Sequence, residues 1–354
     1  MPHVQIPHHQ KVTTPMTRKH SFRTLLTAGI VASLALAACG SDSDGGGSAA
    51  NPTTIRIGYQ IIPNGDLIVK NKGWLEEAFG KDVKIEWSLF DSGGSVNEAI
   101  VAGALDIGLA GSSPVSRGIS QGITYQVPWI HDVIGKAESL VAKEGIATIA
   151  DLKGKTVATP FASTAHFSLL AALADAGVAE ADVNVIDAEP ADIYAAWQRG
   201  DIDAAYVWNP NLAKMIAEGG TVLITSADLA AKGKTTYDLS VVTNDFASKY
   251  PAAVQTWVAQ QDRAVALIND NPDDAAASLA VEMSITAEEA KAQLGDLVFV
   301  SAKDQAGADY LGGGLAANLF AAAKFNVEQG KIDAVKDEAE YTKAVNATFA
   351  AAVK

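Results

Sequence analysis

The chain has 354 residues, a formal net charge of −14 and a single cysteine, Cys39. This length exceeds one ordinary domain and allows two sizeable cores. The acidic charge disfavours binding to nucleic acid, and one cysteine excludes an internal disulfide.

The N-terminal segment predicts export. A basic stretch after Met16 is followed by an apolar run over residues 25–38 and by small residues just before Cys39, which is typical of a secretory signal. The apolar run is shorter than the ~20 residues that a membrane span needs. The sequence LAACG, residues 36–40, resembles the lipobox of bacterial lipoproteins. This resemblance implies that Cys39 is lipidated and becomes the mature N-terminus.

We therefore interpret residues 1–38 as a signal peptide with an N-terminal extension, and residues 39–52 as a lipidated cysteine followed by a flexible linker. The linker is rich in Gly, Ser and Asp and has nothing to pack. Cleavage removes four basic residues and no acidic residue, so the formal charge moves from −14 to −18. We expect the lipid, and not charge, to hold the body at the membrane.

The body opens as strand, helix, strand. Residues 55–59 (IRIGY) alternate like a strand, an amphipathic helix through Trp74 and Phe79 follows, and residues 83–87 form a second strand. A helix over residues 96–102 leads to a third strand at 106–110. This order predicts an α/β layer fold.

Two turns from strand to helix predict an anion site. GSSP, residues 111–114, ends the third strand, and ATPFAST, residues 158–164, ends a later one. The first N–H groups of a helix lack internal partners and lie at the positive end of its dipole, so they attract an oxyanion. Both turns carry hydroxyl donors, namely Ser112, Ser113, Ser163 and Thr164. The alternative is that these residues only cap their helices, but two such turns in opposite halves favour a clamp.

Two lobes are expected, because the apolar runs 139–143 and 239–243 can pass between two halves of the body. We predict lobe 1 over residues 53–140 and 241–354 and lobe 2 over residues 141–240. Lobe 2 contains further strand signals at 183–187 and 203–208. Residues from 244 onward predict helices that pack on lobe 1.

Two further side chains stand at the ends of predicted strands. Glu138 lies where the chain leaves lobe 1, and Trp208 ends a buried strand, where α/β sheets commonly place ligand contacts. Trp208 can form a wall for a small alkyl group or pack in the core.

Five sequence blocks resemble the substrate-binding proteins of sulfonate and nitrate uptake systems, and among them the taurine-binding branch. In chain order they are FDSGGS (90–95), GSSP (111–114), ESLV (138–141), PFASTAHFSLLAAL (160–173) and AAWQRGDIDAAYVWNP (195–210). The resemblance implies a two-lobed periplasmic-binding-protein-like α/β fold of type II, joined by two crossing strands and closing by hinge motion. It also implies a function, which is capture of taurine or a related sulfonate for an ABC permease and its ATPase.

Taurine carries a sulfonate and an ammonium, so its site needs both oxyanion donors and a carboxylate. The resemblance implies Asp238 as the first candidate for the ammonium, with Glu138 as the second. Gln60 and Trp208 would orient the ligand and cover its methylenes. The candidates for the sulfonate are Ser112, Ser113, Ser163, Thr164 and His166. His166 could instead pack in the first turn of its helix.

Other ligands stay open: another aliphatic sulfonate, nitrate or a thiamine-pyrimidine precursor. Residues 63–65 and Asn209 depart from the family pattern. An enzyme is disfavoured, because related thiamine-precursor enzymes rely on a cysteine-rich segment and no serine here stands in a nucleophile-elbow pattern. A purely structural lipoprotein would not need two anion-binding turns. We expect no cofactor and no metal site, and a monomer anchored by lipid to the outer face of the cell membrane.

Overall fold

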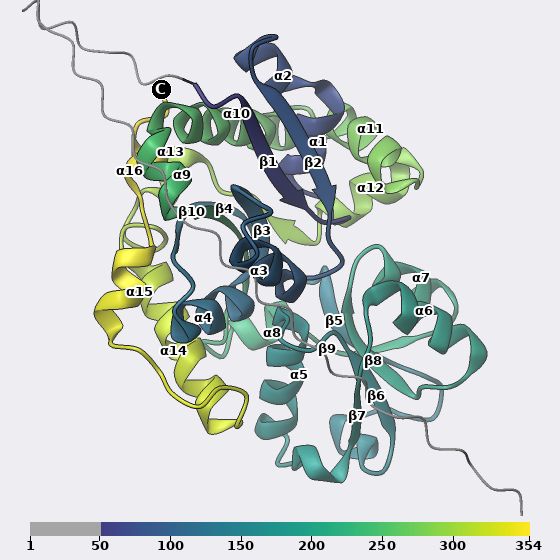
Figure 1. Ribbon diagram of the computed structural model, residues 1–354. Helices are drawn as coiled ribbons and strands as arrows, with labels where there is room; N and C mark the ends of the chain where they lie inside the picture. Colours follow the sequence, from purple (N-terminus) through teal and green to yellow (C-terminus); the bar gives the residue numbers. More distant parts are fainter. Residues whose placement is uncertain (1–50) are drawn as a thin grey trace, which may run out of the picture. The chain divides into compact units, whose positions relative to one another are not determined.

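A computed structural model describes residues 51–354 of the chain (Figure 1). The predicted signal sequence, Cys39 and most of the linker lie outside the described residues, so lipidation stays a prediction. Within residues 51–354, none of the helices combines the length and the apolar composition needed to cross a membrane.

The first sheet has six strands in the order β11-β4-β10-β3-β1-β2. Their bounds are β1 (Thr54–Tyr59), β2 (Lys84–Leu89), β3 (Ile107–Gly111), β4 (Tyr125–Ile134), β10 (Tyr237–Thr243) and β11 (Leu297–Val298). Strand β1 pairs in parallel with β2 and β3. Strand β10 returns from much later in the chain and lies antiparallel between β3 and β4.

The second sheet has five strands in the order β7-β6-β8-β5-β9. They are β5 (Glu138–Ala142), β6 (Thr156–Thr159), β7 (Asn184–Asp187), β8 (Ala204–Trp208) and β9 (Thr221–Thr225). Both faces are covered: Ala204 and Tyr206 of β8 pack in one core cluster, and Ala205 and Val207 pack in another. Because both faces are buried, β8 reads as a continuous apolar run.

Helices of the first half connect the strands of the first sheet. They are α1 (Gly65–Lys72), α2 (Trp74–Phe79), α3 (Gly93–Val101) and α4 (Ser112–Gln121). The single helix predicted through Trp74 and Phe79 is wrong, because Gly73 breaks it with a left-handed φ of 63°, a conformation that glycine adopts at little cost.

The second sheet is covered by α5 (Thr164–Asp175), α6 (Pro190–Arg199), α7 (Asn211–Ala217) and α8 (Ser226–Ala230), shown in teal in Figure 1. Short 3-10 turns lie at Ile149–Leu152 and Glu180–Asp182. Helices α5 and α8 pack in the core cluster on one face, and α6 and α7 in that on the other.

The C-terminal part is helical, as predicted, except for the two residues of β11. It contains α9 (Asn244–Lys249), α10 (Pro251–Asp270), α11 (Pro272–Met283), α12 (Ala287–Leu294), α13 (Ala302–Gln305), α14 (Gly314–Glu328), α15 (Glu338–Ala344) and α16 (Thr348–Ala351). Its apolar side chains, such as Trp257, Leu279 and Leu315, share one core with the first sheet. Helix α14 also reaches the second half, where Phe325 meets Phe167 at a ring separation of 4.9 Å.

The chain crosses between the two sheets twice, from β4 to β5 and from α8 to β10. The predicted two-lobed α/β fold is therefore confirmed. From here on, lobe 1 denotes the first sheet with its helices, and lobe 2 the second sheet with its helices. The cavity described next is lined by residues of both.

Candidate functional site

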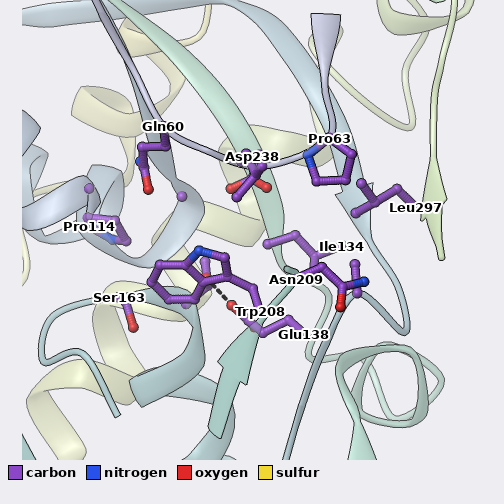
Figure 2. Close-up of a pocket in the computed structure, with 15 residues that line it drawn as sticks. Gln60, Pro63, Pro114, Ile134, Glu138, Ser163, Trp208, Asn209, Asp238 and Leu297 are labelled. Carbon is purple, nitrogen blue, oxygen red and sulfur yellow. Dashed lines mark hydrogen bonds between the residues drawn. The ribbon is translucent and has the colours of Figure 1, made fainter. Parts of the chain in front are cut away.

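A cavity lies where strand ends and helix starts of the two lobes meet (Figure 2). It has an empty volume of about 480 Å³, which includes space open to solvent. Its lining residues are Gln60, Ile62, Pro63, Gly93, Gly111, Pro114, Ile134, Ala137, Glu138, Ser163, Thr164, Trp208, Asn209, Asp238 and Leu297. Six of the nine predicted site residues are in this set: Gln60, Glu138, Ser163, Thr164, Trp208 and Asp238.

Three helices begin in the cavity wall. Gly93 is the first residue of α3, Gly111 caps α4 and Ser163 caps α5. Their first N–H groups lack partners within the helix and lie at the positive ends of the dipoles. Among the described lining residues none is Lys, Arg or His. The positive potential that the cavity offers to an anion therefore comes from backbone N–H groups.

The starts of α4 and α5 approach each other closely across the lobes. A Cβ atom on Gly111 would lie 2.6 Å from Cγ2 of Thr164, which is closer than real Cβ contacts allow. Glycine is therefore required at this position for the two helix starts to face one cavity.

Glu138, at the start of β5, is a buried carboxyl in the cavity wall. It accepts hydrogen bonds from the hydroxyls of Thr164 at 2.5 Å and Ser226 at 2.9 Å, and a longer one from Ser168 at 3.4 Å. Burial raises the pKa of Glu138 to about 7, although the three hydroxyls favour the ionised form. Near neutral pH this group can therefore carry a negative charge inside the cavity.

Asp238, on β10, is a second carboxyl of the cavity. Burial, and after it the nearby Glu138 carboxyl, raises the pKa of Asp238 to about 7. Directly across the strand pair lies Asp132 on β4, whose side chain is fully buried. Burial and the neighbouring Asp238 raise the pKa of Asp132 well above its usual range. Two carboxyl groups thus line the cavity, and a third, that of Asp132, lies beside Asp238.

Gln60 and Trp208 line the cavity between the helix starts and the Asp238 carboxyl. The Gln60 amide donates from Nε2 to the Leu109 carbonyl at 3.0 Å, which leaves its oxygen as the acceptor that points into the cavity in Figure 2. The half-buried Trp208 indole stands beside it at the end of β8. Apolar contact surface is added by Ile62, Ile134 and Leu297.

Ser112, Ser113 and His166 do not line the cavity. The Ser112 hydroxyl accepts from the Tyr237 backbone N–H at 3.2 Å. The His166 ring stacks on Phe161 with centroids 4.5 Å apart, and burial lowers its pKa to about 4, so it is neutral at pH 7. The Thr164 hydroxyl donates to Glu138, so only its backbone N–H is available to an anion. Direct ligand contacts by these side chains stay predictions.

Several residues near the cavity were not predicted from the sequence, above all Asp132, Gly93 and Gly111. Asp132 stands inside the apolar strand YQVPWIHDVI, and a carboxylate in such a run is a signal in itself. The register between β4 and β10 is irregular at this point, since Asp238 pairs with Asp132 while Leu239 pairs with Ile130. This β-bulge leaves His131 as the extra residue, so the sequence could not show which strand partner Asp132 meets.

The sequence profile of the NMT1-like family matches residues 48–284, well over half of the chain. The chain belongs to the NMT1-like family. Two curated relatives of this NMT1-like protein come from Escherichia coli (strain K12). The taurine-binding periplasmic protein is 39% identical over 200 residues, which cover 56% of this chain and 62% of that protein. A putative aliphatic sulfonates-binding protein is 32% identical over 241 residues, covering 67% and 74% respectively.

Solved structures extend the likeness to the fold. The periplasmic aliphatic sulphonate binding protein of Escherichia coli superposes on the NMT1-like chain with a TM-score of 0.68 and 27% identity. That superposition covers 82% of this chain and 97% of the solved one. The predicted resemblance to taurine- and sulfonate-binding proteins is therefore confirmed. The match to the taurine-binding relative spans less than two thirds of that protein's length.

Proposed function

We propose that this protein is the extracytoplasmic substrate-binding component of an ABC importer, and that it captures taurine or a closely related aminosulfonate. One observation carries the proposal: the cavity combines three helix N-termini with the carboxyl groups of Asp238 and Glu138. A ligand with an anionic and a cationic end fits both parts at once.

The sulfonate end is assigned to the starts of α3, α4 and α5. A sulfonate has three oxygens that share one negative charge, and unpaired backbone N–H groups can donate to all of them. Because no basic side chain is required, the charge complement stays modest and suits a monoanion. Ser163 is the one lining serine, but its hydroxyl already donates to the Pro160 carbonyl at 2.6 Å, so we assign it a capping role at this end.

The ammonium end is assigned to Asp238, with Glu138 nearby. An ammonium group donates three hydrogen bonds and prefers ionised oxygens. The side-chain oxygen of Gln60, which points into the cavity (Figure 2), adds a neutral acceptor. Between the two ends, Trp208 and the apolar lining would contact the methylene groups.

A ligand without a cationic end fits this cavity less well. It would leave carboxyl groups buried without a partner, so they would either stay charged at a cost of several kcal/mol or keep a proton. This argument favours taurine over nitrate or an amine-free sulfonate. The relatives include a taurine-binding protein and a putative aliphatic sulfonates-binding protein. The preference for taurine over an amine-free sulfonate is therefore the quantity to measure.

Anchoring and partners follow from the same proposal. We propose that Cys39 carries the lipid, that the linker places the body on the outer face of the membrane, and that the loaded protein docks as a monomer on a permease driven by an ATPase. The relatives named above are binding proteins, and we propose no enzymatic activity, no nucleic-acid partner and no cofactor.

Calorimetry with a ligand panel tests the proposal. The protein is first unfolded and refolded to remove carried-over ligand and is then titrated with taurine, ethanesulfonate, nitrate and sulfate. We expect taurine to bind at least about tenfold more tightly than ethanesulfonate, a difference of ~1.4 kcal/mol. Equal affinities for the two would reject the ammonium assignment, and binding of nitrate alone would reject the sulfonate class.

A further inference from the structure

A second aspartate lies behind the proposed ammonium contact. Asp132 of β4 is the direct antiparallel partner of Asp238 on β10, and directly paired residues project from the same face of a sheet. Asp132 is 0% exposed, and neither of its carboxylate oxygens has a hydrogen-bond donor among residues 51–354. An ionised carboxylate that is buried without donors costs several kcal/mol. The presence of Asp132 at this position therefore has to be explained.

Among residues 51–354, the strand neighbours of the aspartate pair supply no compensating positive charge. On the other side of β10, the residue paired with Asp238 is Gly111, and β11 places Leu297 and Val298 against β4. His131, next in the chain, lies 3.6 Å from Asp66 and is neutral, since burial lowers its pKa to about 3. The Glu138 carboxyl from β5 has the same sign, and its charge raises the pKa of both aspartates.

Asp132 is fully buried, and Asp238 beside it is half-buried and lines the cavity. Two adjacent carboxyl groups in such surroundings do not both ionise without positive partners, so they retain one proton between them. Burial raises the pKa of both groups, and the charge of the neighbouring Asp238 carboxyl raises the pKa of Asp132 further. Near neutral pH the ligand-free pair therefore carries one proton and one negative charge.

We propose that Asp132 determines specificity in the cavity by sharing a proton with Asp238, and that the pair exchanges this proton for the ammonium group of the ligand. The carboxyl O–H bond breaks and its proton leaves to the buffer, while the ammonium keeps its own protons and takes its place. The net charge of the occupied pair is unchanged by the exchange. This inference rests on the proposed function, because it needs a ligand with a cationic end.

The exchange explains how the cavity would reject an amine-free ligand. Such a ligand offers nothing to replace the proton, so the pair stays protonated and gains no new contact. A ligand with an ammonium meets two ionised carboxylates in place of one. The expected signature is release of protons on binding of taurine but not of ethanesulfonate.

Proton release can be counted by calorimetry of the full chain at pH 6.5, in phosphate and in imidazole buffer, which differ in ionisation enthalpy. For the wild type we expect a release approaching one proton per taurine from the pair, in addition to any from Glu138. In Asp132→Asn only the Asp238 carboxyl of the pair remains to titrate, so the proton release falls clearly below that of the wild type. Its preference for taurine over ethanesulfonate falls about tenfold or more.

Asp82→Asn serves as the matched control, because Asp82 is an exposed aspartate of the same lobe. It is expected to keep the wild-type proton count. An Asp132→Asn variant that releases as many protons as the wild type would overturn the proposal. Thermal unfolding of each variant checks that it is folded.

A measurement on the ligand-free protein tests this inference separately from the proposed function. The carboxyl carbons of the ligand-free protein are titrated by 13C NMR. We expect the wild-type pair to titrate in two steps and to keep one proton well above pH 5, and Asp132→Asn to leave a single step, that of Asp238. If taurine fails to bind but this titration holds, the ligand assignment is wrong and the proton-sharing pair stands. If both carboxyls are already ionised at pH 5, the inference fails whatever the ligand.

Discussion

At the scale of residues, Asp238 carries the proposed recognition of an ammonium group. It lines the cavity, and its carboxyl has no described basic neighbour among the lining residues. The proposal gives it a role that its amide analogue cannot fill, because Asn has nearly the same shape but no charge.

The substitution Asp238→Asn is therefore expected to weaken taurine at least about thirtyfold, since loss of one partner of a buried charge pair costs ~2 kcal/mol or more. Binding of ethanesulfonate is expected to change by less than about threefold, because this ligand has no cationic group to lose a partner. Calorimetry of both ligands on this variant and on Asp82→Asn gives the comparison. Parallel losses for the two ligands would show that Asp238 supports the cavity without contacting the ammonium.

Residue types and spacing identified six of the fifteen lining residues, but not the roles of their side chains. Ser163 and Thr164 were predicted from a turn, and both line the cavity. The Thr164 hydroxyl, however, donates to Glu138, and the Ser112 hydroxyl accepts from β10. Sequence spacing predicts where a helix starts, but the partner of a hydroxyl depends on which distant strand packs beside it.

At the scale of elements, the meeting of α4 and α5 defines the proposed anion site. The gap between Gly111 and the Cγ2 methyl of Thr164 has no room for a side chain. Since these helix starts belong to different lobes, we expect their distance to depend on how the two lobes are placed.

Gly111→Ala is expected to hold the helix starts apart and to weaken taurine and ethanesulfonate alike, by about tenfold or more, because an overpacked contact costs ~1–3 kcal/mol. The double variant Gly111→Ala with Thr164→Ser removes the opposing methyl and keeps the hydroxyl for Glu138. It is expected to recover most of the affinity. A double variant as weak as Gly111→Ala would argue that the alanine acts elsewhere.

Most elements could be predicted from sequence patterns, whereas two features could not. β9 was missed, because five residues after Gly219 and Gly220 give little periodicity and the strand forms only by pairing with β5 at the sheet edge. The Asp132–Asp238 pair was also missed, because a β-bulge and a pairing over more than a hundred residues bring it together. Both depend on contacts between distant parts of the chain, which local patterns do not encode.

At the scale of the whole body, the buried carboxyls link stability to pH. Burial raises the pKa of Asp66 to about 7, as it does for Glu138 and Asp238. In the unfolded chain these groups ionise near pH 4, so the folded protein binds more protons between about pH 4 and 7. Stability is therefore lost as the pH rises through this range.

Two buried histidines act in the opposite direction. Burial lowers the pKa of His131 to about 3 and that of His166 to about 4, so the unfolded chain binds their protons below about pH 6.5. Below about pH 6.5 the histidines offset part of the loss of stability that the carboxyls cause as the pH rises. Above that pH they offset very little of it. The net stability of the ligand-free protein should therefore fall most clearly between about pH 6 and 7.5.

Thermal unfolding of the ligand-free protein across pH 5–8 measures this dependence. Each carboxyl contributes about 1.4 kcal/mol per unit of pKa shift. Asp66→Asn is the informative variant, because the Asp66 carboxyl accepts from Gln261 at 2.6 Å and does not line the cavity. It is expected to reduce the pH slope while leaving the affinity for taurine unchanged. A stability that rises steadily up to pH 8 would contradict the assignment of buried protonated carboxyls.

The central claim is that one cavity binds both ends of a zwitterion, and a crystal structure with taurine tests it most directly. The account predicts the sulfonate against the starts of α3, α4 and α5 and the ammonium within hydrogen-bond distance of Asp238, with Trp208 along the methylenes. A reversed orientation, or a ligand bound away from Gly111 and Asp238, would contradict it.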